Sequence, residues 1–354
     1  MIDLLINLLN IPSPTFQEEK ITDFIEDWMF CHVEGVLVKT VGNSRIFSLP
    51  MIDNLPHIGL VGHTDVVPKH FEVYQRKDLL FGAGASDMKG ALAPFMMLME
   101  SCSKWSDRHL NFSFVLYCAE EGTPLEENGL YHLILGEEEF LKTLDLAIVG
   151  EPTNGCIQVG CVGSLHAEVI IRGVACHSAR PWDGENALYK ALPFIRSIAE
   201  IKPLKKTVFG VDFFDVINVT ESKSENGRTS IPGQWACNIN YRYAPGPSMQ
   251  EAEIEFNNLL VSTGFEKLEF TVLDHVPSAQ IIETELLNKF VCFLGRQVEA
   301  KQAWTDVAQL NGIDIPAFNF GPGLTQQAHK ANEYISLRDV VDYYKILHEL
   351  IKNY

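Results

Sequence analysis

Cationic side chains are scarce in this sequence of 354 residues. Lys and Arg together number 28 against 46 Asp and Glu, which gives a formal net charge of −18. A charge of that sign repels phosphate backbones and anionic lipid headgroups. No apolar run reaches the roughly 20 residues that a bilayer-spanning helix needs, and Met1–Leu4 lacks the basic stretch of a signal peptide. We therefore expect a soluble, cytoplasmic protein that binds neither nucleic acid nor membranes.

Paired cysteine motifs are also missing. None of the eight cysteines stands in a Cys-x-x-Cys pair, and in a chain of this length they do not suggest a disulfide framework. Buried free thiols in a reducing compartment are the expected setting. A zinc site built from thiolates is not expected for the same reason, so any metal would have to be bound through His and carboxylate groups.

The sequence does contain enough apolar residues, 46% of the total, to form a large core, and its length predicts about two domains. The apolar runs 57–62, 112–118 and 144–150 are typical of strands buried on both faces, and 90–102 is typical of a helix. This β–α–β alternation predicts an open, mostly parallel α/β sheet. The same pattern returns after about residue 278, with a strand at 316–320.

Two capping boxes, Thr15–Glu18 and Ser248–Glu251, predict the starts of helices. The first precedes what we expect to be the first helix of the chain. The last helix of the chain is expected to bury one apolar stripe, which consists of Leu337, Val340, Val341, Tyr344, Leu347 and Ile351.

The middle of the chain has a different character. The segments 165–172, 214–220, 235–243 and 268–274 alternate or are half polar, as strands of a half-exposed sheet do. A helical pattern at 185–200 and the one after the second capping box lie among them. We therefore predict a discontinuous α/β domain of residues 1–163 and 279–354, interrupted by an inserted α+β domain of residues 164–278.

Five polar segments carry His and carboxylate side chains at the predicted carboxyl ends of strands. They are 62–65, 84–90, 119–122, 150–153 and 327–330. Open α/β sheets bind ligands in the crevice outside the carboxyl ends of their strands, so the five segments could meet there. Their His and carboxylate groups are donors that zinc accepts without thiolate.

Each of these residues has an ordinary structural interpretation when it is taken singly. His63 could be a hydrogen-bonded structural histidine, and Asp87 could cap the helix that follows it. However, the adjacent like charges Glu120 and Glu121 end an apolar strand, where they need a positive charge to compensate them. Asp65 also follows His63 at i+2, so both side chains lie on the same side of an extended segment. A carboxylate in that position can hold a metal-ligating imidazole through the N–H that does not face the metal.

Three of the motifs resemble those of the aminoacylase/carboxypeptidase family of dinuclear zinc hydrolases. They are Gly-His-Thr-Asp-Val-Val-Pro at 62–68, Asp-Met-Lys-Gly at 87–90 and Gly-Glu-Pro-Thr at 150–153. The resemblance covers nearly the whole chain, and the motifs follow one another in the same order as in the family. It implies a zinc-peptidase-like catalytic domain of the α/β class, with an inserted ferredoxin-like α+β domain that serves as a lid and in dimerisation.

The resemblance also implies a metal-ligand set. Asp87 would bridge two Zn²⁺ ions in each subunit, for which Co²⁺ can substitute. His63 and Glu151 would complete one site, and Glu121 and His329 the other. The peptide bond from Asp87 to Met88 would be cis.

The roles of the remaining site residues follow from the same resemblance. Glu120 would be the general base and Asp65 the carboxylate that orients His63. His177, from the other subunit of a homodimer, would donate to the oxyanion, although it could also merely cap a helix. Arg242 would bind a substrate carboxylate, although it could also be a solvated residue at the edge of a sheet. Gly323 would bring backbone N–H groups close to the substrate.

Further motifs at 160–163, 177–182 and 319–323 resemble those of the members that remove the succinyl group from N-succinyl-LL-2,6-diaminopimelate, a small-molecule N-acyl amino acid. The chain departs from that pattern at Cys161-Val162 and at Thr229–Pro232, and Thr305-Asp306 matches the substrate loop of the family only in part.

The departures at 161–162 and 229–232 concern recognition of the acyl group and leave the predicted metal ligands intact. Three alternatives are weighed beside the main interpretation. One is acetylornithine deacetylase or another N-acyl-amino-acid hydrolase or metallocarboxypeptidase of the family. Another is a metal-free binding protein on the same scaffold. The third is a thiol hydrolase that uses Cys176, which lacks an accompanying Cys-His-Asn pattern.

Overall fold

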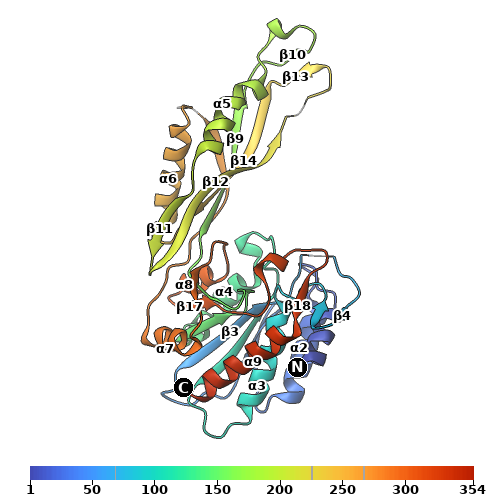
Figure 1. Cartoon of the computed structure of the whole chain (residues 1–354), viewed down its shortest axis with the longest axis vertical. Helices are drawn as coiled ribbons and strands as arrows, with labels where there is room; N and C mark the ends of the chain where they lie inside the picture. The colour runs from blue at the N-terminus through green and yellow to red at the C-terminus, as the bar shows by residue number, and fades with distance from the viewer. Residues whose placement is uncertain (68, 225, 266–267) are drawn as a thin grey trace. The chain divides into compact units, whose positions relative to one another are not determined.

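The computed structural model describes residues 1–67, 69–224, 226–265 and 268–354. These residues form two compact units (Figure 1): the first consists of Met1–Gly160, Ile281–Glu299 and Asp306–Tyr354, and the second of Cys161–Gln280 and Ala300–Thr305.

The sequence prediction placed the hexapeptide 300–305 in the catalytic domain, whereas its hydrogen bonds attach it to the second unit. The Val162 N–H donates to the Lys301 carbonyl at 3.3 Å. The side-chain amide of Gln302 accepts from the Phe214 N–H at 3.0 Å and donates to the Phe214 carbonyl at 2.6 Å. A few hydrogen bonds between segments that are distant in the sequence leave no signal in hydrophobic periodicity, so this attachment could not be predicted.

The first unit is built on an eight-stranded sheet in the order β1-β2-β6-β3-β7-β17-β8-β16. The strands are β1 (Leu37–Val41), β2 (Ser44–Ser48), β6 (Asn111–Tyr117), β3 (His57–His63), β7 (Leu146–Val149), β17 (Ala317–Asn319), β8 (Ile157–Val159) and β16 (Val298–Ala300). The central strands β6, β3, β7 and β17 are mutually parallel, and β1, β2 and β8 pair antiparallel. The predicted open α/β sheet is therefore confirmed, as a mixed sheet with a parallel centre.

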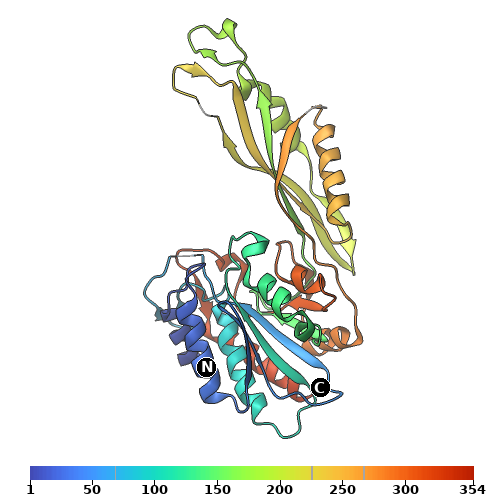
Figure 2. The ribbon, with the colours of Figure 1, turned by 180° about the vertical axis from the view of Figure 1, so that it is seen from behind.

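The central strands are apolar because both faces of the sheet are covered by helices. All seven residues of β3 and of β6 are buried. Helices α3 (Lys89–Ser103) and α9 (Leu337–Lys352) lie side by side on one face, and α4 (Gly129–Leu141) lies on the other (Figures 1 and 2). Helices α1 (Ile2–Asn10) and α2 (Glu19–His32) pack against α3.

The N-terminal helices differ from the prediction. The chain begins with α1, which the sequence analysis did not predict, and α2 starts at Glu19 without any side-chain cap. The proposed capping box was wrong because its polar side chains bond elsewhere: the Thr15 hydroxyl donates to Asp65 Oδ2 at 3.0 Å, and Glu18 Oε1 accepts from the Ala119 N–H at 2.9 Å.

The buried stripe of α9 also differs in part from the prediction. Val340, Leu347 and Ile351 are buried as expected, but Tyr343 and Leu350 take the places predicted for other residues. Leu337, Val341 and Tyr344 are only half-buried. Tyr343 reaches inward because its hydroxyl donates to the Phe320 carbonyl at 2.6 Å.

A small antiparallel sheet completes the first unit, with the order β18 (Tyr334–Ser336), β5 (Leu79–Phe81) and β4 (Tyr74–Arg76). The other helical elements described in this unit are a 3₁₀ turn at Leu125–Glu127, α7 (Glu285–Leu294), α8 (Val307–Asn311) and a 3₁₀ turn at Thr325–Gln327. Among the described residues, none of the helices combines the length and the hydropathy that crossing a bilayer requires.

The second unit carries a five-stranded antiparallel sheet in the order β11-β12-β14-β9-β15. Its elements are β9 (Gly163–Arg172), α5 (Ala187–Glu200), β11 (Leu204–Val208), β12 (Val211–Lys223), β14 (Gln234–Tyr243), α6 (Met249–Ser262) and β15 (Glu269–Val276). A further two-stranded ladder joins β10 (Cys176–His177) to β13 (Ser230–Ile231), and a 3₁₀ turn covers Pro181–Asp183. The succession β9–α5–β12–β14–α6–β15 is the βαββαβ arrangement of ferredoxin-like folds, extended by β11. The predicted class of the inserted domain is confirmed.

Two local predictions for the second unit are also confirmed. The Ser248 side chain accepts from the Glu251 N–H at 3.3 Å, and Glu251 returns the bond, so the second capping box is present. In β14 the alternate residues Trp235, Ile239 and Tyr241 are buried against the two helices.

Candidate metal centre

Three of the five predicted segments meet because they follow adjacent parallel strands. His63 is the last residue of β3, Glu120 and Glu121 follow β6 closely, and Glu151 follows β7. Because β6, β3 and β7 are parallel neighbours, their carboxyl ends lie at one edge of the sheet.

The other two segments reach the same place by different routes. Residues 84–88 connect β5 of the small sheet to α3, so this segment does follow a strand, although not one of the large sheet. The segment 327–330 begins at the end of a 3₁₀ turn, so the prediction that it follows a strand was wrong. Neither connection could be read from the apolar runs of the sequence.

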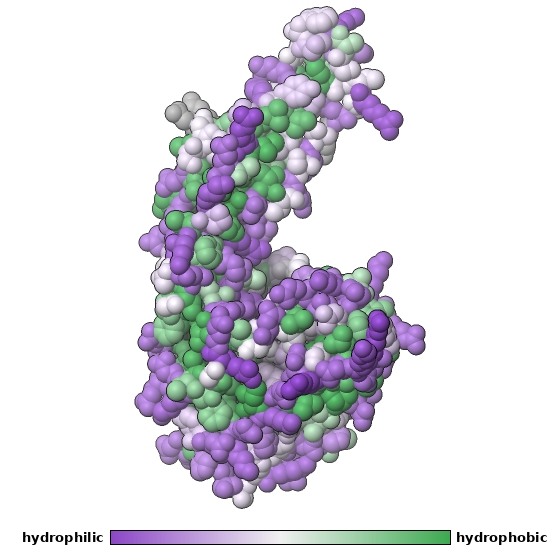
Figure 3. Space-filling view, viewed as in Figure 1, coloured by the Kyte–Doolittle hydropathy of each residue, from purple (hydrophilic) through white to green (hydrophobic). Residues whose placement is uncertain are grey.

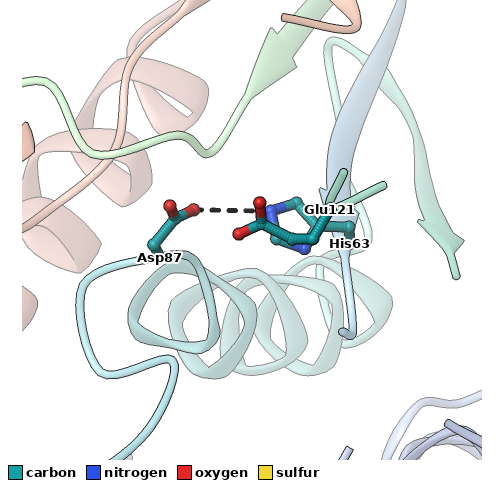
Figure 4. A group of neighbouring side chains, drawn as sticks. All are labelled: His63, Asp87 and Glu121. Carbon is teal, nitrogen blue, oxygen red and sulfur yellow. Dashed lines mark ion pairs between the residues drawn. The ribbon is translucent and has the colours of Figure 1, made fainter. Parts of the chain in front are cut away.

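The structure brings the two histidines and three carboxylates of these segments together. His63 Nε2 lies 3.4 Å from Asp87 Oδ1 and 3.6 Å from Glu151 Oε1. His329 Nε2 lies 3.0 Å from Glu121 Oε2 and 3.7 Å from Asp87 Oδ2. Each oxygen of Asp87 therefore faces a different imidazole. Figure 4 shows Asp87 directed at His63 with Glu121 beside it, and ligand atoms of these three residues all lie within 4.8 Å of one another.

Burial and mutual charge effects shift the pKa values of the side chains in this cluster. Burial raises the pKa of Glu120 well above its ordinary value, and nearby carboxylates oppose the effect of His63 there. Burial also raises the pKa of Glu121. Burial acts to lower the pKa of His63, but the carboxylates around it outweigh burial and raise it. The hydrogen bond to Glu121 raises the pKa of His329 to about 9. All four shifts favour the uptake of positive charge by the cluster.

The orientation of His63 tests whether a cation fits here. Its Nδ1 donates to the backbone carbonyl of Asp65 at 3.1 Å, with Asp65 Oδ1 at 3.4 Å. Its Nε2 is buried and has no hydrogen-bond partner within the described part of the chain, while it faces two carboxylates. An imidazole held through one nitrogen and aimed at carboxylates through the other is typical of a metal ligand. The donor set of His and carboxylate therefore fits divalent cations.

Asp65 contacts more groups than the sequence predicted. Besides lying beside His63, its Oδ1 accepts from the Glu120 N–H at 3.0 Å and its Oδ2 from the Glu121 N–H at 2.9 Å. Burial opposes ionisation, but these hydrogen bonds and His63 keep the pKa of Asp65 below its ordinary value. Asp65 thus holds the backbone of both glutamates in addition to one imidazole.

Sequence reasoning missed Glu333, whose side chain is fully buried. Its Oε2 accepts from the Gly84 N–H at 2.7 Å, and its Oε1 accepts from the N–H groups of Ser86 and Asp87 at 2.7 and 2.8 Å. Burial raises the pKa of this carboxyl to about 7. Because its partners are backbone groups of a distant segment, no side-chain motif indicated it.

The peptide bond from Asp87 to Met88 is cis, as the family resemblance implied.

Asp306 belongs to the first unit and lies close enough to the cluster to help raise the pKa of Glu120. Its buried carboxylate accepts from the Tyr117 hydroxyl at 2.6 Å, from Asn128 Nδ2 at 3.2 Å and from Gln309 Nε2. Burial raises its pKa to about 6. The partial match at Thr305-Asp306 spans the point where the chain returns to the first unit, since Thr305 ends the hexapeptide of the second unit and Asp306 begins the last segment of the first. The Asp306 carboxylate is bonded by three protein donors.

Close packing explains why glycine occupies positions 321 and 323 of the loop. A Cβ at Gly321 would collide with the Gly150 carbonyl, directly before Glu151. Gly323 has φ of +88° and lies where a Cβ would come within 2.7 Å of Ser86 Oγ, directly before Asp87. This loop therefore packs closely on two of the segments that carry the cluster.

Two predicted site residues belong to the second unit. Arg242 lies on the half-buried polar face of β14, where its Nε donates to Asn240 Oδ1 at 2.9 Å. His177 lies in β10 with an exposed ring, and its Nδ1 accepts from the Ala179 N–H at 3.1 Å. A neutral His177 ring therefore carries its proton on Nε2. Pro68, the last residue of the first motif, lies outside the described residues.

Comparison with known proteins extends over both units. Residues 59–353 match the peptidase family M20/M25/M40. The succinyl-diaminopimelate desuccinylase of Corynebacterium glutamicum is 31% identical over 350 residues, which cover 97% of this chain and 94% of that protein.

Solved structures show the same fold. A tripeptidase from Staphylococcus aureus aligns with a TM-score of 0.81 at 19% identity and covers 99% of this chain and 97% of its own. A dinuclear metal-binding peptidase of the M20 family from Bacillus subtilis aligns with a TM-score of 0.73 at 16% identity, covering 99% and 96%. The family match spans every residue of the cluster, from His63 to His329.

Proposed function

The chain belongs to the peptidase family M20/M25/M40, and from this membership we propose that it is a metal-dependent amide hydrolase. Its proposed reaction converts N-succinyl-LL-2,6-diaminopimelate to succinate and LL-2,6-diaminopimelate, a step of diaminopimelate and lysine synthesis. Two findings support this proposal: the similarity to a desuccinylase along nearly the whole chain, and the arrangement in which Asp87 faces both His63 and His329.

The proposed cofactor is a pair of Zn²⁺ ions per subunit. His63 and Glu151 would hold one ion, Glu121 and His329 the other, and Asp87 would contribute one oxygen to each. The donor set supports this choice, because Zn²⁺ accepts imidazole and carboxylate ligands together. When bound, such ions lower the pKa of a shared water and polarise the amide carbonyl.

Glu120 is the proposed general base. Its carboxylate is the one that the ligand assignment leaves free, and its backbone is held by the bond from its N–H to Asp65. Glu120 would take the proton of the attacking water and return it to the leaving amine, a role that requires a carboxyl placed beside the metals without being bound by them. Asp65 would meanwhile keep His63 in the tautomer with its proton on Nδ1.

Arg242 is the proposed binding group for a substrate carboxylate. A guanidinium binds a carboxylate through two parallel hydrogen bonds. The bond from Nε to Asn240 orients this guanidinium on the polar face of β14, and its terminal nitrogens would form such a pair.

A homodimer is the proposed assembly. Large apolar side chains gather on the helical face of the second unit (Figure 3), where Tyr189 and Leu192 of α5 and Ile254 of α6 are exposed. Contact with a second copy would remove them from water. In such a dimer the partner subunit's His177 would donate its Nε2–H to the oxyanion of the tetrahedral intermediate.

The cytoplasm is the proposed compartment. The eight cysteines are free, as is usual there.

A substrate panel tests the proposed reaction. We expect the zinc-loaded protein to show the highest kcat/KM on N-succinyl-LL-2,6-diaminopimelate, with N-acetylornithine and a tripeptide as competitors, and a chelator to abolish the activity. A clear preference for N-acetylornithine would instead identify a deacetylase of the same family. Activity that persists unchanged after complete metal removal would overturn the metal-dependent mechanism.

A further inference from the structure

The segment that carries the shared carboxylate, Asp87, receives unusual support from one side chain. Backbone N–H groups that are buried need an acceptor, and Gly84, Ser86 and Asp87 share a single one, the carboxylate of Glu333. Both of its oxygens are used, at 2.7 to 2.8 Å. The ammonium of the buried Lys89, which attracts this carboxylate, donates instead to the carbonyls of Leu8 and Ile11.

The backbone around Glu333 joins the same two segments. The Gly82 N–H donates to the Glu333 carbonyl at 3.1 Å, and the Ser86 hydroxyl donates to the Tyr334 carbonyl at 2.8 Å. Strands β18 and β5 then continue the pairing. His329 lies only four residues before Glu333, so the segment that presents one proposed ligand also holds the backbone of another.

We propose that Glu333 is a positioning residue, which fixes the backbone of Asp87 relative to His329 and thereby pre-forms the shared part of the two metal sites. This inference rests on the proposed metal binding. The hydrogen bonds of Glu333 to this segment go to three backbone N–H groups, and its charge also acts on Asp87 and His329.

The choice of a carboxylate is explained by the geometry. A glutamine has the same length but only one acceptor oxygen, and its NH₂ group would face at least one backbone donor. In Glu333→Gln the segment 84–87 would have to shift, and Asp87 with it. Because Asp87 faces both histidines, the change weakens binding of both ions together rather than of one.

The test measures metal binding directly, without substrate. Zinc titrations followed by calorimetry, and the visible spectrum of the Co²⁺-loaded protein, are compared for wild type and Glu333→Gln. Changes in residues that support metal ligands typically cost 10- to 100-fold in affinity. We expect a loss of about that size at both sites, an altered Co²⁺ spectrum and a partial recovery in Glu333→Asp, which keeps both oxygens.

Asp215→Asn is the matched control. Asp215 is a buried carboxylate of the second unit that also accepts from a backbone N–H, that of Ala244 at 2.7 Å. Its substitution should lower the unfolding temperature and leave the zinc affinity unchanged. If Glu333→Gln binds two ions as tightly as wild type and gives the same Co²⁺ spectrum, the inference is wrong, although the proposed function stands. If wild type itself binds no zinc, the proposed function fails.

Hydrogen exchange on the unaltered protein keeps the inference testable even if the Glu333 variants do not fold. If Glu333 holds the three N–H groups by itself, the amides of Gly84, Ser86 and Asp87 should exchange slowly even in the metal-free protein. Exchange that is fast without metal and becomes slow only when zinc is added would show that the ions, and not Glu333, order this segment.

Discussion

The two ends of strand β3 hold histidines in opposite states. His57 at the amino end and His63 at the carboxyl end are equally buried, each with 1% of its surface exposed. The ring of His57 is satisfied by two hydroxyls, Thr143 at 2.9 Å and Ser113 at 2.8 Å, and burial lowers its pKa to about 4. His63 is surrounded by carboxylates that raise its pKa against the effect of burial.

This contrast shows that burial alone does not decide the chemistry of a histidine. At the amino end the imidazole ring is bonded by neutral hydroxyls, and the one carboxylate there, Asp145, accepts from the His57 backbone N–H at 2.8 Å. The other end collects more anionic groups than the protein can neutralise, which is the arrangement that a cation completes. The predictions below test this difference between the two ends.

The largest effect is expected from Glu120→Gln at the carboxyl end. The amide cannot accept the proton of the attacking water, so kcat should fall by about 10³-fold, within the range for loss of a general base. Zinc content, measured by emission spectroscopy, should stay at the wild-type value. Glu126→Gln, at an exposed glutamate of the following 3₁₀ turn, is the control and should retain full activity. A Glu120→Gln enzyme with near-normal kcat would contradict the role of the base.

Metal removal should have the next largest effect and should act on stability. Ions that bind only the folded state stabilise it by about 2.7 kcal/mol at a free concentration of 100 times Kd. The metal-free protein should therefore melt at a lower temperature in calorimetry and recover when zinc is added. In Asp87→Asn the recovery should be much smaller, because one side chain serves both sites. Identical melting curves with and without zinc would show that the carboxyl end is not a metal site.

The smallest effect concerns pH and the amino end of the strand. The pKa of His57 is about 4 in the folded protein against 6.5 for the unperturbed group. Between these values the unfolded chain binds more protons, so stability falls as the pH decreases through this window. From pH 6.5 to 5 the loss is about 1.6 kcal/mol, because the slope reaches its full 1.36 kcal/mol per pH unit only well below pH 6.5.

Urea unfolding of the metal-free protein at pH 7, 6 and 5 measures this loss. His57→Gln should be less stable than wild type at pH 7, because it loses hydrogen bonds, but its stability should decline less steeply toward pH 5. The carboxylate cluster is common to both proteins and cancels in the comparison. Parallel declines would mean that His57 is not held neutral by the fold.

The sequence predicts well whatever depends on apolar runs and on side-chain motifs. Strands β3, β6 and β7 and helix α3 follow from continuous hydrophobicity, and the residues of the cluster follow from motifs such as Gly-His-Thr-Asp at 62–65. It fails where side chains bond to the backbone of a distant segment. Glu18 looked like part of a capping box and Glu333 belonged to no recognised motif, yet both accept hydrogen bonds from loops that follow strands. The partners of Asp306, Tyr117 and Asn128, are likewise far away in the sequence and could not be predicted from it.

The assignment of 300–305 to the second unit has a practical consequence. The chain passes between the two units at four peptide links and not two, since it also crosses at 299–300 and 305–306. A fragment cut at 161 and 280 for separate expression would therefore be incomplete, because Phe214 would lose the amide of Gln302. Anyone who wishes to produce this piece alone would have to graft the missing hexapeptide back onto it, for example through an added connecting loop.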